Sequence, residues 1–153
     1  MSILLKRTNK LMKKLLLIFV FLSVLLSANK GFGQLSLSYQ FSYWNKIGLG
    51  YTFSPKIWTE LRIYSNTNLD SFTPELVFLL NVTKKERHEI YIGIGGVANV
   101  FEGLVFPVGL QFRPIANFNR FSMQIEFEPI MDIGGDDFIF QSSAGIRYTF
   151  GKE

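Results

Sequence analysis

The 153-residue chain contains no cysteine and only one histidine. The lack of cysteine excludes disulfides, thiolate metal sites, a cysteine nucleophile and lipoprotein-type acylation. No stretch has a convincing helical period. Gly93, Gly95 and Gly96 do not form a phosphate loop, because no Lys-Ser/Thr pair follows them. We therefore expect a protein that is not an enzyme and has no catalytic residue, cofactor or metal site.

Acidic residues are missing from the first 33 positions, which hold six of the 16 basic residues. Without this segment, 10 basic residues face 12 acidic ones, so the net charge of the remainder is −2, against +4 for the whole chain. A basic chain ordinarily suggests a nucleic-acid partner, but here the excess belongs to one segment. We expect no nucleic-acid binding.

Residues 1–33 have the layout of a secretory signal peptide: a basic stretch ending at Lys14, an apolar run and a short exit of small residues. The run from Leu15 to Ala28 has 14 residues, whereas a membrane-spanning helix needs about 20. The small residues at 31 and 33 predict cleavage before Gln34. Met12 is an alternative start, since a chain beginning there has a more ordinary leader.

From Gln34 onward, apolar and polar residues alternate, and a period of two predicts strands. Turn signals separate the segments, and such short connections join antiparallel neighbours. Eight strands of about 9–11 residues are typical of a small bacterial transmembrane barrel. We predict an all-β, eight-stranded antiparallel up-and-down transmembrane β-barrel over residues 34–153, preceded by the cleaved signal peptide over 1–33. The expected strands are residues 35–44, 47–54, 57–65, 75–82, 88–99, 104–113, 121–131 and 138–150.

Alternation alone also permits a soluble lipocalin-like barrel, whose apolar face points inward. Lysine is absent from the predicted strand interiors, which favours lipid outside, since water-facing strands usually carry lysine. The apolar face also holds more large rings than a small closed interior can pack. The lysines expected at turns or the terminus are Lys46, Lys56, Lys84, Lys85 and Lys152.

Aromatic residues gather near the predicted strand ends, as in the interfacial girdles of membrane barrels. Three prolines, Pro74, Pro107 and Pro129, are expected near the outer rim if the mature N-terminus starts in the periplasm. The expected girdle residues are Tyr43, Trp44, Phe53, Trp58, Tyr64, Phe101, Phe138, Tyr148 and Phe150.

The polar face carries charged residues that such a barrel would enclose. Buried charges persist only when they are paired and hydrogen-bonded, so we expect a salt-bridge network that fills the lumen. Arg62 is expected to serve neighbouring acids, and Glu89 to lie opposite Arg113. A proton or cation path along the acids is the alternative. The expected members are Glu60, Arg62, Glu75, Glu89, Arg113, Glu126, Glu128 and Arg147.

The last predicted strand, SAGIRYTF, resembles the terminal assembly motif of outer-membrane barrel proteins at Ser143, Gly145, Tyr148 and Phe150. Three further residues follow the aromatic that usually ends such chains. The resemblance implies the barrel-assembly machinery as a partner. In strand count and loop length the mature chain resembles small barrels of the OmpA or OmpX type. This implies a monomer in the outer membrane of a Gram-negative bacterium, exported through the inner membrane and in contact with lipid and lipopolysaccharide.

His88 and an acidic loop remain as candidate sites. Lipid-A-modifying barrel enzymes need a histidine with a serine or an acid, but Glu89 points to the opposite face of the strand from His88. We interpret His88 as a solvated or interfacial side chain. The loop with Asp132, Asp136 and Asp137 lacks EF-hand spacing and is interpreted as a solvated turn, with binding of Ca²⁺ as the alternative.

The expected function is a small integral outer-membrane barrel with a structural, envelope-maintaining or surface-interaction role. Two alternatives remain at this point. One is a lipid-modifying enzyme of the same membrane, and the other is a soluble periplasmic carrier of a hydrophobic ligand.

Overall fold

The computed structural model describes residues 34–65, 72–100, 102–134 and 137–151, which lie within the unit Gln34–Glu153. The predicted leader, the alternative start at Met12, and Phe101, Asp136 and Lys152 lie outside these residues. Among the residues described, no helix is long and apolar enough to cross a membrane.

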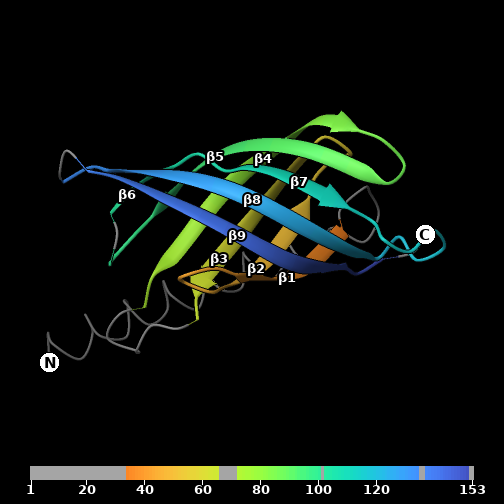
Figure 1. The fold of residues 1–153 in the computed structure, drawn as a ribbon, viewed down its shortest axis with the longest axis horizontal. Coiled ribbons are helices and arrows are strands. Elements are labelled where there is room, and N and C mark those ends of the chain that lie inside the picture. The colour runs from red at the N-terminus through yellow and green to blue at the C-terminus, as the bar shows by residue number, and fades with distance from the viewer. Residues whose placement is uncertain (1–33, 66–71, 101, 135–136, 152–153) are drawn as a thin grey trace, which may run out of the picture. The chain divides into compact units, whose positions relative to one another are not determined.

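The described residues form strands that pair antiparallel throughout (Figure 1). β6 and β7 are two parts of one strand, because both pair with β5 on one side and β8 on the other. β1 pairs with β9, which closes the sheet. The predicted eight-stranded antiparallel barrel is thus confirmed. The strands are β1 (Gln34–Phe41), β2 (Lys46–Thr52), β3 (Ile57–Tyr64), β4 (Pro74–Lys84), β5 (His88–Val97), β6 (Gly103–Val105), β7 (Val108–Phe112), β8 (Phe121–Asp132) and β9 (Phe138–Thr149).

The apolar face of the sheet points outward. Leu37, Leu49 and Leu61 are direct neighbours across β1, β2 and β3, and their exposed fractions are 48%, 44% and 40%. Serine and glutamine alternate with the outward residues of β1 and are buried. A lipocalin-like carrier needs the reverse arrangement, so the structure does not favour that alternative.

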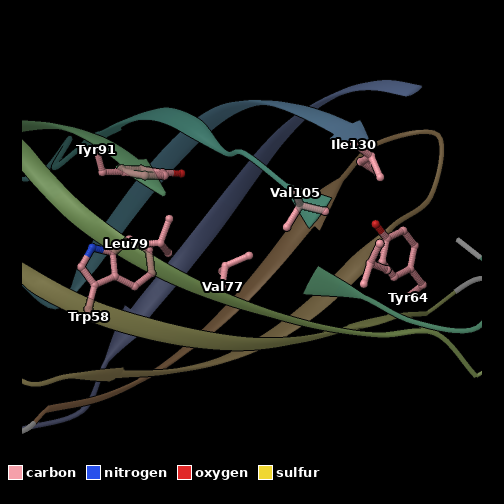
Figure 2. Packing of buried hydrophobic residues seen from close by; sticks show 8 residues of the cluster. Trp58, Tyr64, Val77, Leu79, Tyr91, Val105 and Ile130 are labelled. Atoms are coloured by element: carbon pink, nitrogen blue, oxygen red, sulfur yellow. The ribbon is translucent and has the colours of Figure 1, made fainter. Parts of the chain in front are cut away.

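A small apolar cluster lies inside the barrel together with the polar residues. Trp58, Leu79 and Tyr91 group at one end of the view in Figure 2, and Tyr64 and Ile130 at the other. All five side chains are buried.

The predicted aromatic girdle is therefore wrong at three positions. Trp58 and Tyr64 share the inward face of β3 with Glu60 and Arg62, as a strict period of two requires. Trp44 is half-buried and packs against the interior cluster. Tyr43, Phe53, Phe138 and Phe150 are exposed, and Tyr148 is half-buried.

Two further expectations need correction. Lys46 is not in a turn: it begins β2 and is 1% exposed. Pro107 does not lie at a rim, because it is buried between β6 and β7, beside Gly93, whose amide donates to its carbonyl. Having no amide hydrogen, Pro107 interrupts the ladder and splits the sixth predicted strand.

Candidate functional site: the charged interior of the barrel

Arg62 on β3 is the centre of a buried ion-pair network. Its Nε donates to Glu60 Oε2 at 2.9 Å. Its two terminal nitrogens reach Glu126 at 2.7 and 2.8 Å, and Nη1 also contacts Glu75 at 3.0 Å and Glu128 at 2.9 Å. The planar guanidinium, with five donors, suits this task better than a lysine. One side chain thus connects carboxylates from β3, β4 and β8.

Lys46 is a second cation of this network, although the sequence analysis predicted that it lies in a turn. Its Nζ lies 3.0 Å from Glu75 Oε2 and 2.5 Å from Glu128 Oε1. The ammonium also lies 4.9 Å from the ring centre of Tyr64. The residue follows Asn45, which suggested a turn. The overlooked signal is the period of two in β2, since Lys46, Gly48 and Gly50 share the inward face.

Arg147 on β9 is the third cation. Its Nη2 contacts both oxygens of Glu60 at 3.1 Å, and its guanidinium lies 3.8 Å from the ring centre of Trp58. The hydroxyl of Ser38 on β1 donates to the same carboxylate. Glu60 therefore binds groups from β1, β3 and β9.

Two tyrosine hydroxyls complete the hydrogen bonding of the acids. Tyr91 donates to Glu126 Oε2 at 2.7 Å, and Tyr64 donates to Glu75 Oε2 at 2.9 Å. The sequence analysis placed Tyr64 in the aromatic girdle and made no prediction for Tyr91. A tyrosine on the same face as buried acids is the signal that could have found them, because a buried hydroxyl needs a partner.

The network contains three cationic and four acidic side chains, all at most 5% exposed. With every group ionised it carries one net negative charge. Each carboxylate accepts at least two hydrogen bonds, and this satisfaction is what makes buried charge tolerable. Carboxylates bound in this way connect β3, β4 and β8 with β1, β2, β5 and β9, and so can hold the strands together.

Glu89 and Arg113 form a separate cluster near the β4–β5 hairpin. Their ion pair measures 2.7 Å, and Glu89 also lies 3.6 Å from Lys84 Nζ and 3.3 Å from Asn81 Nδ2. Trp58 and Tyr91, whose ring centres are 5.4 Å apart, lie inward of this cluster along β3 and β5. The eight charged residues expected in one lumen set thus fall into two groups.

The four residues that resemble the assembly motif lie on β9 and just beyond it. Gly145 is buried, Ser143 and Tyr148 are half-buried, and Phe150 is exposed. Gly145 pairs with Gln40 on one side and Gln124 on the other. A Cβ on Gly145 would lie 2.6 Å from the carbonyl oxygen of Tyr39. Close packing inside the barrel is therefore a sufficient physical reason for this glycine.

The remaining candidates do not form a site among the described residues. His88 is half-buried at the start of β5, while Glu89 next to it is buried. Asp132 Oδ1 accepts a hydrogen bond from the Gly134 amide at 3.0 Å, which is a local turn contact. No group of three or more His, Asp or Glu side chains able to hold a metal ion is found in the part of the chain that the structure describes.

Comparison with known proteins supports the fold and no further assignment. No protein-family description and no curated protein matches the chain. A solved structure titled "De novo design of transmembrane beta-barrels" is similar, with a TM-score of 0.56 and 13% sequence identity. The similarity covers 77% of this chain and 94% of the designed one. At this identity the likeness shows a common barrel fold.

Proposed function

We propose that the chain is a small integral β-barrel protein of the outer membrane of a Gram-negative bacterium. Its role is structural, envelope-maintaining or surface-interacting, it is a monomer without enzymatic activity, and its lumen is filled by side chains. The observation that carries this proposal is the sidedness of the barrel, with charges enclosed and large apolar side chains outside.

A barrel with this sidedness is unfavourable in water, because its outer face is apolar. Soluble monomers rarely expose contiguous apolar patches larger than a few hundred Å². Here every one of β1 to β5 and β7 to β9 carries large apolar side chains that are at least 37% exposed. In a bilayer the same residues meet acyl chains, and the closed ladder leaves few backbone groups unpaired. The designed protein of similar fold is titled a transmembrane barrel.

The outer membrane is favoured over other membranes by two sequence features. The leader-like segment over 1–33 implies export. The terminal strand with Ser143, Gly145, Tyr148 and Phe150 resembles the motif read by the barrel-assembly machinery, which we propose as a partner in folding. Membrane lipid and lipopolysaccharide would then be the permanent neighbours of the apolar belt.

A lipid-modifying enzyme in the same membrane is the competing function. It lacks a specific supporting observation, because the buried carboxylates are engaged by Arg62, Lys46 and Arg147. Mass spectrometry of lipid A from a deletion strain separates the two functions. Unchanged lipid A agrees with our proposal, and loss of a modification contradicts it.

The direct test is migration on a denaturing gel with and without boiling. A folded outer-membrane barrel resists the detergent until boiled, so we expect two bands of different mobility from membrane fractions. Mass spectrometry of the membrane-extracted chain should give a mature form beginning at Gln34. A monomer that stays folded in buffer without any detergent would overturn the assignment to a membrane.

A further inference from the structure

Charged residues outside the buried network separate to the two rims of the barrel. One rim holds the β2–β3 and β4–β5 turns and the β7–β8 connection. Among the described residues, the acids there are Glu86 and Glu89, and the basic residues are Lys56, Lys84, Lys85, Arg87, Arg113 and Arg120. At the opposite rim the charged residues among those described are Glu102, Asp132 and Asp137, all acidic. We call the first rim the basic rim; in Figure 1 it lies at the right, where β4 and β9 end.

The basic rim contains a cavity of about 780 Å³. Its walls come from the β4–β5 hairpin, the β7–β8 connection and the ends of β1 and β9. Among the described residues that line it, Glu86 is the one acid. Five of the lining side chains are cationic: Lys84, Lys85, Arg87, Arg113 and Arg120. Like charges gathered in one concave space raise the local potential and favour an anion there.

Backbone hydrogen bonds hold the cationic segments around this cavity. The Arg113 amide donates to the Arg87 carbonyl at 2.8 Å, and the Thr149 amide donates to the Arg120 carbonyl at 2.8 Å. The two-residue β4–β5 turn is closed by the Lys85 amide on the His88 carbonyl at 2.9 Å. Hydrogen bonds of the folded barrel thus fix the backbone from which these cationic side chains extend.

Among the described residues, the acids Glu86 and Glu89 leave a net positive charge on the five cations of the cavity. Glu89 binds Arg113 at 2.7 Å and approaches Lys84 at 3.6 Å. Lys85 and Arg87 are exposed. Arg113, which Glu89 compensates, also donates to the uncharged Glu86 carbonyl at 3.4 Å.

We propose that the cavity of the basic rim binds a phosphate-bearing anion. Phosphate offers several acceptor oxygens on one compact group, and the guanidinium fork of arginine matches their geometry. Two sources share this chemistry: the headgroup of an anionic phospholipid in the adjacent leaflet, and a soluble phosphate compound. The headgroup source rests on the proposed membrane location, whereas the soluble source does not.

The test uses the protein expressed from the full sequence and purified from membranes in a zwitterionic detergent. Inorganic pyrophosphate is titrated by calorimetry into the parent protein and into the double variant Lys85→Gln, Arg87→Gln. The matched control is Lys56→Gln, an exposed lysine of the same rim that does not line the cavity. We expect saturable binding that weakens about tenfold or more in the double variant, since each charge-assisted contact contributes substantially to affinity, and by less than about twofold in the control.

Bilayers of defined composition distinguish the two sources. The titration is repeated in phosphatidylcholine vesicles with and without phosphatidylglycerol. If phosphatidylglycerol weakens pyrophosphate binding to the parent protein but not to the double variant, the cavity is assigned to a lipid headgroup. If the parent protein binds pyrophosphate equally well in the two kinds of vesicle, the cavity is assigned to a soluble phosphate. Gel migration before and after boiling verifies that each variant is folded. Absence of saturable binding to a folded barrel, an equal loss in Lys56→Gln, or binding of an acidic peptide without pyrophosphate would overturn the proposal and leave the membrane assignment intact.

Discussion

At the scale of single residues, Arg62 has the largest electrostatic role. It connects four carboxylates within a space from which water is excluded. Removing one partner of a buried ion pair leaves an uncompensated charge, which costs about 3–5 kcal/mol. The attraction between the partners largely offsets their own desolvation, so the network matters most when it is broken.

Arg62→Ala is therefore expected to lower the free energy of unfolding by about 3–5 kcal/mol or to prevent folding. Guanidinium unfolding in lipid vesicles measures the change. Arg87→Ala is the matched control, because Arg87 lies in an exposed turn, and it should change the free energy by less than about 0.5 kcal/mol. Equal stability of the two variants would contradict the central role of Arg62.

Glu89 and Arg113 allow a finer test, because their 2.7 Å pair is near the rim, where the Arg113 side chain is 18% exposed. Each single change to alanine leaves the other charge without its main partner. The double variant loses both charges at once, so its destabilisation should be smaller than the sum of the single ones, by about 0.5–3 kcal/mol. Additive losses in the unfolding assay would show that the two side chains do not interact energetically.

At the scale of elements, glycines on the inward face make room for side chains that cross from one strand to another. Gly109 on β7 pairs with Tyr91 on β5 and with Glu126 on β8. The Tyr91 ring lies over Gly109 and its hydroxyl reaches Glu126. A Cβ at position 109 would lie 2.2 Å from Cζ of Tyr91 and 2.3 Å from its hydroxyl oxygen.

Gly109→Ala should consequently displace the ring, break its hydrogen bond and lower the free energy of unfolding by about 1–3 kcal/mol. Gly96→Ala on β5 is the control, since the nearest atom to its added Cβ is 3.7 Å away. Thermal unfolding followed by circular dichroism compares the two. A Gly109→Ala barrel that unfolds at the same temperature as Gly96→Ala would show that the ring is not confined as described.

The period of two was sufficient to predict the strands and most of the charged interior, because one residue of slip would move every side chain to the other face. It failed where another signal competed with it. Asn45 suggested a turn at Lys46, and the aromatic character of Trp58 and Tyr64 suggested a membrane interface. The register shift between Asn81 and Thr83 depends on pairing across strands, which the sequence does not display. The break at Pro107 follows from a proline that the sequence does show, and the expectation that this residue lies at a rim hid it.

At the scale of the whole molecule, the layers of side chains predict a closed lumen. Apolar side chains lie on each side of the charged network (Figure 2). The side nearer the basic rim of the barrel holds Trp58, Leu79 and Tyr91, and the side nearer the other rim holds Tyr64 and Ile130. Vesicles containing the protein should therefore swell in a small sugar no faster than protein-free vesicles. Vesicles with a wide-pore barrel serve as the positive control. Swelling above the protein-free rate would contradict a side-chain-filled interior.

The outward belt gives the most direct prediction about the surroundings of the molecule. Leu49 is flanked by Leu37 and Leu61 in the middle of the strands. If this face meets acyl chains, Leu49→Arg places a charge near the bilayer midplane and should cost about 2–4 kcal/mol. Val82→Arg is the control: Val82 is 59% exposed near the end of β4, and close to the interface the same change should cost about 0–1 kcal/mol. Unfolding in vesicles measures both variants, and equal costs at the two depths would mean that no bilayer surrounds the belt.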